Sequence, residues 1–173
     1  FPENLTLEKI KAGEMADDEF AVPEIGSISF RYYIGFRKRS EHLSAGKRGA
    51  RIYCKIRLPA GPTLFNLGTG MHSFHSADYM ECIVEANELD RGSVDLISTS
   101  RTQLQEGNEI FDALQEKVGS LMRAAIAKHG AFRERIASAE IDSDPKGQII
   151  KRSVEQLPTK TRKAATRLLT TIA

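Results

Sequence analysis

Residues 28–37 read ISFRYYIGFR, and this stretch decides the predicted fold. Apolar and polar side chains alternate along it, and it is rich in aromatic and β-branched residues. Alternation with period two is typical of a half-buried β-strand. Residues 51–58, RIYCKIRL, repeat the pattern. We therefore predict a second strand with Ile52, Cys54, Ile56 and Leu58 on one face and Arg51, Tyr53, Lys55 and Arg57 on the other.

The next residues predict a turn and a third strand. Pro59-Ala60-Gly61-Pro62 favours a turn, because proline fixes its own φ and restricts the residue before it. Thr63 to Leu67 then reads as a short strand. Three strands joined by turns make an antiparallel sheet, since parallel neighbours need long crossovers. The expected strands lie near 28–37, 50–58 and 63–68.

Beyond Asp78 the apolar spacing changes to that of a helix. Apolar residues recur at helical intervals from Ile110 to Ala125, and Gly130 is a natural helix stop. We expect a helix spanning about 103–129 that packs on the apolar face of the sheet. Residues 149–173 read as a further helical segment, interrupted at Pro158.

The expected fold class is α+β: a three-stranded antiparallel sheet packed on a long helix, with an additional C-terminal helical segment. A length of 173 residues suits one domain with an appendage. We expect an acidic N-terminal arm at 1–27, a sheet-plus-helix domain at 28–130, and a helical appendage or the start of a following domain at 131–173. The predicted core is Ile28, Phe30, Ile34, Phe36, Ile52, Cys54, Ile56, Phe65, Leu114, Val118 and Leu121.

Composition excludes several classes of protein. With 40% hydrophobic and 28% charged residues, the chain reads as an ordinary globular protein. No apolar run approaches the roughly 20 residues that a membrane helix needs, so we expect no membrane partner. Two cysteines make no disulfide framework, and the expected location is the cytoplasm.

Charge is distributed in blocks of opposite sign. Residues 1–27 carry two bases and seven acids, whereas residues 28–58 carry nine bases and one acid. Residues 78–116 carry ten acids and two bases, and residues 117–173 carry twelve bases and five acids. The net charge of +8 in the second block would repel itself unless something anionic meets it.

The basic block places its long side chains on the outward face of the predicted sheet. Arginine and lysine neutralise phosphates, and tyrosine can hydrogen-bond phosphate or stack on bases. A solvated polar face is the other interpretation, although such faces normally mix both signs of charge. The candidate DNA-binding residues are Arg31, Arg37, Arg51, Tyr53, Lys55, Arg57 and Asn66.

Two segments of this region resemble a known family. Residues 49–57, GARIYCKIR, and residues 65–71, FNLGTGM, are similar to the N-terminal arm-binding domain of tyrosine recombinases, in particular integrases of Bacteroidetes mobile elements. The resemblance covers about residues 28–130. It implies a sheet that reads arm-type sites in duplex DNA during recombination and integration, with other recombinase protomers as further partners.

Catalysis is not expected in this chain. The nucleophile of a tyrosine recombinase would be a C-terminal tyrosine, but no tyrosine follows Tyr79 and no His-x-x-Arg pair is present. His72, His75, Asp78 and Cys82 are potential zinc ligands, yet neither Cys-x-x-Cys nor His-Glu-x-x-His accompanies them. We expect no metal and no cofactor.

Two further hypotheses stay open. The chain could instead be a non-catalytic protein–protein interaction module, whose acidic and basic segments pair with each other or with a partner. The basic residues of the last helix could follow a phosphate backbone, or they could complement a helix C-terminus and the acids of 78–116. Those residues are Lys160, Arg162, Lys163 and Arg167.

Overall fold

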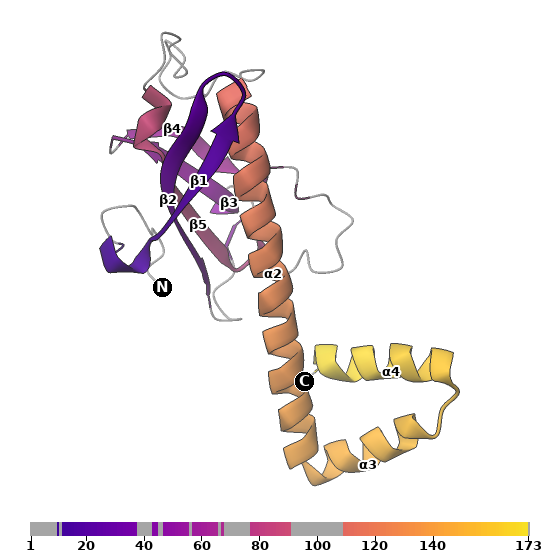
Figure 1. The fold of residues 1–173 in the computed structure, drawn as a ribbon. Helices are drawn as coiled ribbons and strands as arrows, with labels where there is room; N and C mark the ends of the chain where they lie inside the picture. Colours follow the sequence, from indigo (N-terminus) through magenta and orange to yellow (C-terminus); the bar gives the residue numbers. More distant parts are fainter. Residues whose placement is uncertain are drawn as a thin grey trace. The chain divides into compact units, whose positions relative to one another are not determined.

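The computed structural model describes residues 10, 12–37, 43–44, 47–55, 57–65, 67, 77–90 and 109–172. The chain divides into two compact units, Phe1–Ile126 and Ala127–Ala173. The first unit holds a β-sheet and the first part of helix α2, which lies along one face of that sheet (Figure 1). The second unit holds the remainder of α2 and two further helices, α3 and α4.

The sheet has five strands in the order β1-β2-β5-β3-β4. β3 and β5 run parallel, and the other neighbouring pairs run antiparallel. The α+β class with a long helix is therefore confirmed, whereas the three-stranded antiparallel sheet is wrong in detail. The strands are β1 (Ala16–Val22), β2 (Gly26–Phe36), β3 (Gly49–Cys54), β4 (Arg57–Thr63) and β5 (Met80–Glu85).

β5 is the strand that changes the topology. It lies between β2 and β3, so the two alternating segments expected to pair with each other are not neighbours. Five of its six residues are buried, as befits a central strand. The long connection after β3 is what allows β5 to pair with it in parallel.

β1 comes from the segment expected to be an N-terminal arm. Phe20 and Val22 are buried and alternate with exposed residues, so β1 adds an amphipathic edge strand beside β2. The two strands are joined by a tight turn in which Glu24 has a φ of 64° and Gly26 a φ of 100°. Glycine suits the second position because it has no Cβ to oppose a positive φ.

β4 includes the prolines that were expected to form a turn. The predictions of a turn at 59–62 and of a strand at 63–68 are both wrong, because the chain reverses earlier, at Lys55, where φ is 48°. β4 pairs only with β3, and an edge strand tolerates prolines because one side of it needs no ladder hydrogen bonds. The β3–β4 register is irregular, as missing donors would produce.

Three α-helices lie in the described part of the chain, and the first of them is longer than predicted. α2 spans Glu109–Ser143 and runs through Gly130, so the predicted end at 129 is wrong; residues 103–108 lie outside the described part of the chain. Glycine inside a helix costs only about 1 kcal/mol, which a long helix tolerates. α3 (Pro145–Glu155) and α4 (Thr159–Ile172) confirm the C-terminal helical segment. Two short 3-10 helices, η2 (Ala12–Glu14) and η4 (Asn87–Asp90), complete the described elements.

One row of α2 forms the centre of the core. Ile110, Leu114, Val118, Met122 and Ile126 recur every four residues, and all are buried against the sheet. Of the predicted core, seven residues are buried: Ile28, Phe30, Ile52, Cys54, Phe65, Leu114 and Val118. Three are half-buried, namely Ile34, Phe36 and Leu121, and Ile56 lies outside the described residues. The predicted strand over 50–58 is too long, because β3 ends at Cys54 and Lys55 lies in the turn that follows. Within β3 the predicted facing is confirmed, since Ile52 and Cys54 belong to the main core and Tyr53 belongs to the cluster on the opposite face.

Candidate nucleic-acid interface

The sheet face opposite α2 brings together residues of three strands. The β2–β5 register places Arg31 beside Glu85 and Tyr33 beside Ile83. The β5–β3 register places Arg51 beside Ile83 on the other flank. Because side chains alternate along a strand, Glu81, Ile83 and Glu85 all point to this face. Arg31 and Arg51 therefore share the face with carboxylates of β5.

Glu81 lies between two of the predicted DNA-binding arginines. Its carboxylate has no exposed surface and accepts hydrogen bonds from Arg37 Nε at 2.8 Å and from Arg37 Nη2 at 2.5 Å. Its second oxygen accepts from Arg51 Nη2. Burial lowers the pKa of Arg51, and the nearby positive charge of Arg37 acts in the same direction. Arg37 and Arg51 are thus committed to a charged cluster within the sheet.

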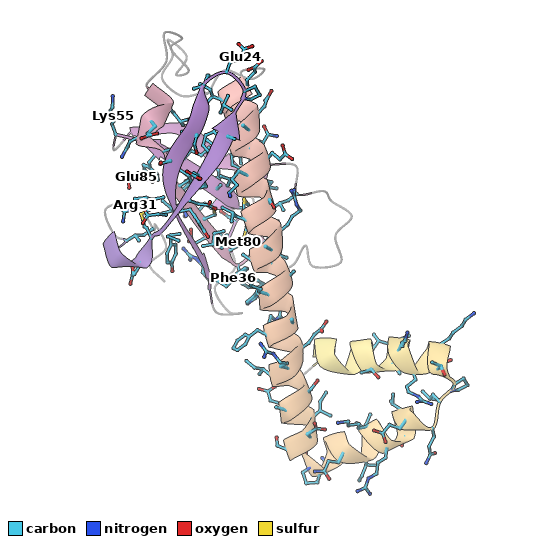
Figure 2. The ribbon with its side chains drawn as sticks, viewed as in Figure 1. Glu24, Arg31, Phe36, Lys55, Met80 and Glu85 are labelled. Carbon is cyan, nitrogen blue, oxygen red and sulfur yellow. The ribbon has the colours of Figure 1, made fainter. Side chains whose placement is uncertain are left out.

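Two more arginines of the basic block also have acidic partners. Arg31 Nη1 lies 3.4 Å from Glu85 Oε2, and its Nε lies 3.6 Å from Asp17 Oδ1 (Figure 2 labels Arg31 and Glu85). Arg48 Nη1 lies 3.1 Å from Asp78 Oδ1. The linear sequence predicts a basic face without acids. In the fold, acids from β1 and from the segment that contains β5 lie beside its arginines.

The N-terminal segment covers part of the same face. Ile10 and Met15 are buried and form a small apolar cluster with Tyr53 and Ile83, against which Tyr33 packs. Tyr53 is consequently only 8% exposed, although it is among the predicted DNA contacts. Burial raises the pKa of Tyr33, and the negative charge of Glu14 adds to the effect.

The surface beside β1 is acidic. An open hollow of about 610 Å³ is bordered by five carboxylates and a single guanidinium. Its charged residues are Asp17, Asp18, Glu19, Arg31, Glu85 and Glu88. A surface of this sign repels phosphate, so this side of the sheet disfavours a nucleic acid.

The β3–β4 hairpin, which we call the edge ribbon, differs from the acidic surface beside β1. Lys55 is exposed at its turn and projects from the sheet (Figure 2). The backbone N–H of Lys55 donates to Asn87 Oδ1 at 2.7 Å, and the Asn87 amide donates to Glu85 Oε1 at 2.9 Å. The ribbon tip is thereby fixed to η4. Arg57 begins β4, and its side chain, like all of Asn66, lies outside the described residues.

The candidate zinc ligands are not gathered among the described residues. His72 and His75 lie outside them, Asp78 pairs with Arg48, and Cys82 is fully buried. Burial raises the pKa of the Cys82 thiol to about 12, which disfavours the thiolate that zinc requires. Within the described part of the chain, no group of three or more His, Cys, Asp or Glu residues could hold a metal ion.

The alternative hypothesis pairs the acidic segment with the basic one, but sequence reasoning did not identify Glu81 and Glu85 as the residues that make this pairing. Their signal is present, because Glu81, Ile83 and Glu85 alternate with Met80, Cys82 and Val84. The opposite net charges of residues 28–58 and 78–116 point to the same pairing. What the sequence alone does not give is the strand order that places β5 in the middle.

Comparison with known proteins adds no family for this chain. No family model matches it, and no curated protein matches it in sequence. Among the described residues, no helix is both long enough and apolar enough to cross a membrane.

Proposed function

We propose that the chain binds duplex DNA through the edge ribbon, as a non-catalytic accessory domain of a site-specific recombinase. The observation that carries the proposal is the exposed Lys55 at the turn of a two-stranded antiparallel ribbon whose second strand begins with Arg57. Because β3 also pairs with β5, the hairpin is the edge of a five-stranded sheet, and its turn and outer strand β4 are the parts proposed to meet the major groove, where β-ribbon and β-sheet proteins read DNA.

The geometry narrows the predicted contact set. Lys55 and Arg57 are the proposed contacts, with Asn66 as a further candidate. Arg37, Arg51 and Tyr53 are buried or paired within the sheet. We therefore assign them a structural role, which is to hold the strands next to the edge ribbon in place. Arg31 adjoins the acidic hollow and is assigned a structural role as well. The resemblance to arm-binding domains supplies the recombination context, with other protomers as partners of the same assembly.

The alternative is a protein interaction module whose acidic and basic segments pair with each other or with a partner. The contacts of Arg31, Arg37 and Arg51 with Glu81 and Glu85 are pairing of the first kind, and they leave fewer charges for an outside partner.

A titration of labelled duplex tests the proposal. The wild-type chain is compared with Lys55→Ala, with Arg57→Ala and with the double variant at several salt concentrations. Each lost phosphate contact should make the slope of log affinity against log salt less steep by about 1. If Arg57 instead reads a guanine edge, its loss should cost about 1–3 kcal/mol on the correct sequence and little on random DNA.

Lys128→Ala provides a matched control, because Lys128 is an exposed lysine on α2 outside the ribbon. The control should bind with the wild-type affinity to within about twofold, as expected of a surface charge that makes no phosphate contact. Equal binding by the control and both ribbon variants, or binding that ignores salt, would refute a DNA contact at the edge ribbon.

A further inference from the structure

The last two helices carry an excess of positive charge. Residues 145–172 contain seven lysines and arginines and one acid, Glu155. The bases are Lys146, Lys151, Arg152, Lys160, Arg162, Lys163 and Arg167. Helices α3 and α4 are therefore strongly basic, and we call their exposed basic residues together the α3–α4 surface.

Most of these charges are not matched by acids. Lys151 pairs with Asp142 at 2.5 Å, and Arg162 donates to the Leu157 carbonyl oxygen at 3.1 and 3.0 Å. The other four whose side chains are described are exposed and have no ion pair among the described residues: Lys146, Arg152, Lys160 and Lys163. In the first unit, in contrast, Arg31, Arg37, Arg48 and Arg51 each lie against a carboxylate.

The helices that bear these charges are well anchored at their ends. Asp144 caps α3 by accepting from the backbone N–H groups of Lys146 and Gly147, both at 3.2 Å. A Cβ at Gly147 would collide with the Ile141 carbonyl oxygen, so α3 starts in tight contact with the end of α2. Arg162 fixes the turn that precedes α4. Lys160 and Lys163, three residues apart, lie on one side of α4.

We infer that the α3–α4 surface binds the phosphate backbone of duplex DNA, as a second contact separate from the edge ribbon. The choice of DNA as the ligand rests on the proposed function. That α3 and α4 form a binding surface is argued independently, from their unmatched positive charges. Lysine is suited to such a contact, because it neutralises phosphates without reading sequence.

An anionic membrane is the competing partner, since Ile149 and Leu168 expose 64% and 62% of their surface. Helices that lie in a membrane interface carry Trp, Phe or Leu on the apolar face, and residues 145–172 contain leucine but no aromatic residue. We take a nucleic acid as the ligand because the proposed function already supplies a duplex, and the vesicle arm of the test below distinguishes the membrane.

The test uses the full chain and a labelled random-sequence duplex, with Lys160→Gln/Lys163→Gln as the variant. Glutamine preserves helix propensity, and circular dichroism should show unchanged helix content. Loss of two phosphate contacts should weaken binding at 0.1 M salt by about tenfold or more and make the log–log salt slope less steep by about 2. Lys128→Gln serves as the matched control and should bind as the wild type does.

Comparison with Lys55→Ala/Arg57→Ala separates this inference from the proposed function. Loss of affinity in the helix variant alone would support the α3–α4 contact and refute the ribbon contact. Loss in the ribbon variant alone would refute the α3–α4 contact and leave the proposed function standing. A wild-type chain that binds no duplex would refute both, as would binding to vesicles containing phosphatidylserine without binding to DNA.

Discussion

Glu81 and Arg37 form a buried ion pair in which one carboxylate oxygen accepts two hydrogen bonds from the guanidinium, at 2.8 and 2.5 Å. Arg51 donates to the other oxygen. In the sheet register, Glu81 lies between Gly35 on β2 and Gly49 on β3, two residues without side chains. The Tyr33 ring lies against Gly35 and the Thr63 backbone lies against Gly49, so a side chain at either position would collide with them. Such a cluster joins three strands around one charge.

Glu81→Ala should lower the free energy of unfolding by about 3–5 kcal/mol, because it leaves buried guanidinium groups without a counter-charge. Urea unfolding followed by circular dichroism measures the change. Glu116→Ala is the matched control, since Glu116 is exposed on α2 in the same unit, and it should change stability by less than about 0.5 kcal/mol. A loss below about 1 kcal/mol for Glu81→Ala would contradict a buried pair.

Two glycines should respond to alanine in opposite directions. Gly49 has a φ of 108°, and a Cβ there would collide with the Thr63 carbonyl oxygen, so Gly49→Ala should destabilise the sheet by more than about 1 kcal/mol. Gly130 lies inside α2 with open space around it, so Gly130→Ala should stabilise the helix by about 0.5–1 kcal/mol. Thermal unfolding of both variants tests the contrast, which fails if both change stability in the same direction.

The sequence predicts elements better than it predicts their neighbours. Alternation identifies β2 and β3, because their apolar residues meet α2 on one face only. β5 escapes notice because it is buried on both faces, where Glu81 is a buried charge rather than a solvent-exposed one. The position of β4 is obscured by Pro59 and Pro62, which only an edge strand tolerates.

In the candidate site too, the sequence predicts which way a side chain faces better than it predicts which residues lie beside it. Alternation correctly places Arg51 opposite Ile52, yet no local pattern shows that Glu81 would lie beside it in the sheet. Tyr53 is outward-facing in the strand pattern, and its burial depends on Ile10 and Met15, which are distant in sequence. Lys55 is exposed, as predicted, but it lies at a turn and not within a strand that continues to residue 58, so local reasoning finds its exposure and not its setting.

The ion pair between Asp18 of β1 and Lys117 of α2 should make stability depend on pH. Burial by itself raises the pKa of Asp18, but hydrogen bonds from Lys117 and from the Glu19 backbone N–H outweigh it, so the pKa falls below its ordinary value of 3.8. A lowered pKa stabilises the fold above pH 3.8, and this contribution disappears as the pH falls through the folded-state value.

Lys117→Gln should therefore lower the free energy of unfolding by about 0.2–1 kcal/mol at pH 7, as for a partly exposed pair. The difference from wild type should shrink as the pH is lowered from 7 to 2, because Asp18 becomes protonated and its attraction to Lys117 is lost. Urea unfolding at the two pH values measures it. A difference that is the same at both would assign the effect to lost packing of the lysine stem and not to the charge.

Cys82 should be chemically inert in the folded chain. Its thiol is fully buried, and burial raises its pKa to about 12 despite the opposing positive charge of Arg51, so almost no thiolate exists at pH 8. Cys54 is also buried, so neither thiol should react with Ellman's reagent under native conditions, while both should react in urea. Ser120→Cys, which places a thiol at an exposed position of α2, should react at once with one equivalent and show that the reagent is active. Rapid labelling of the native wild type would mean that the core around β3 and β5 opens far more readily than its burial predicts.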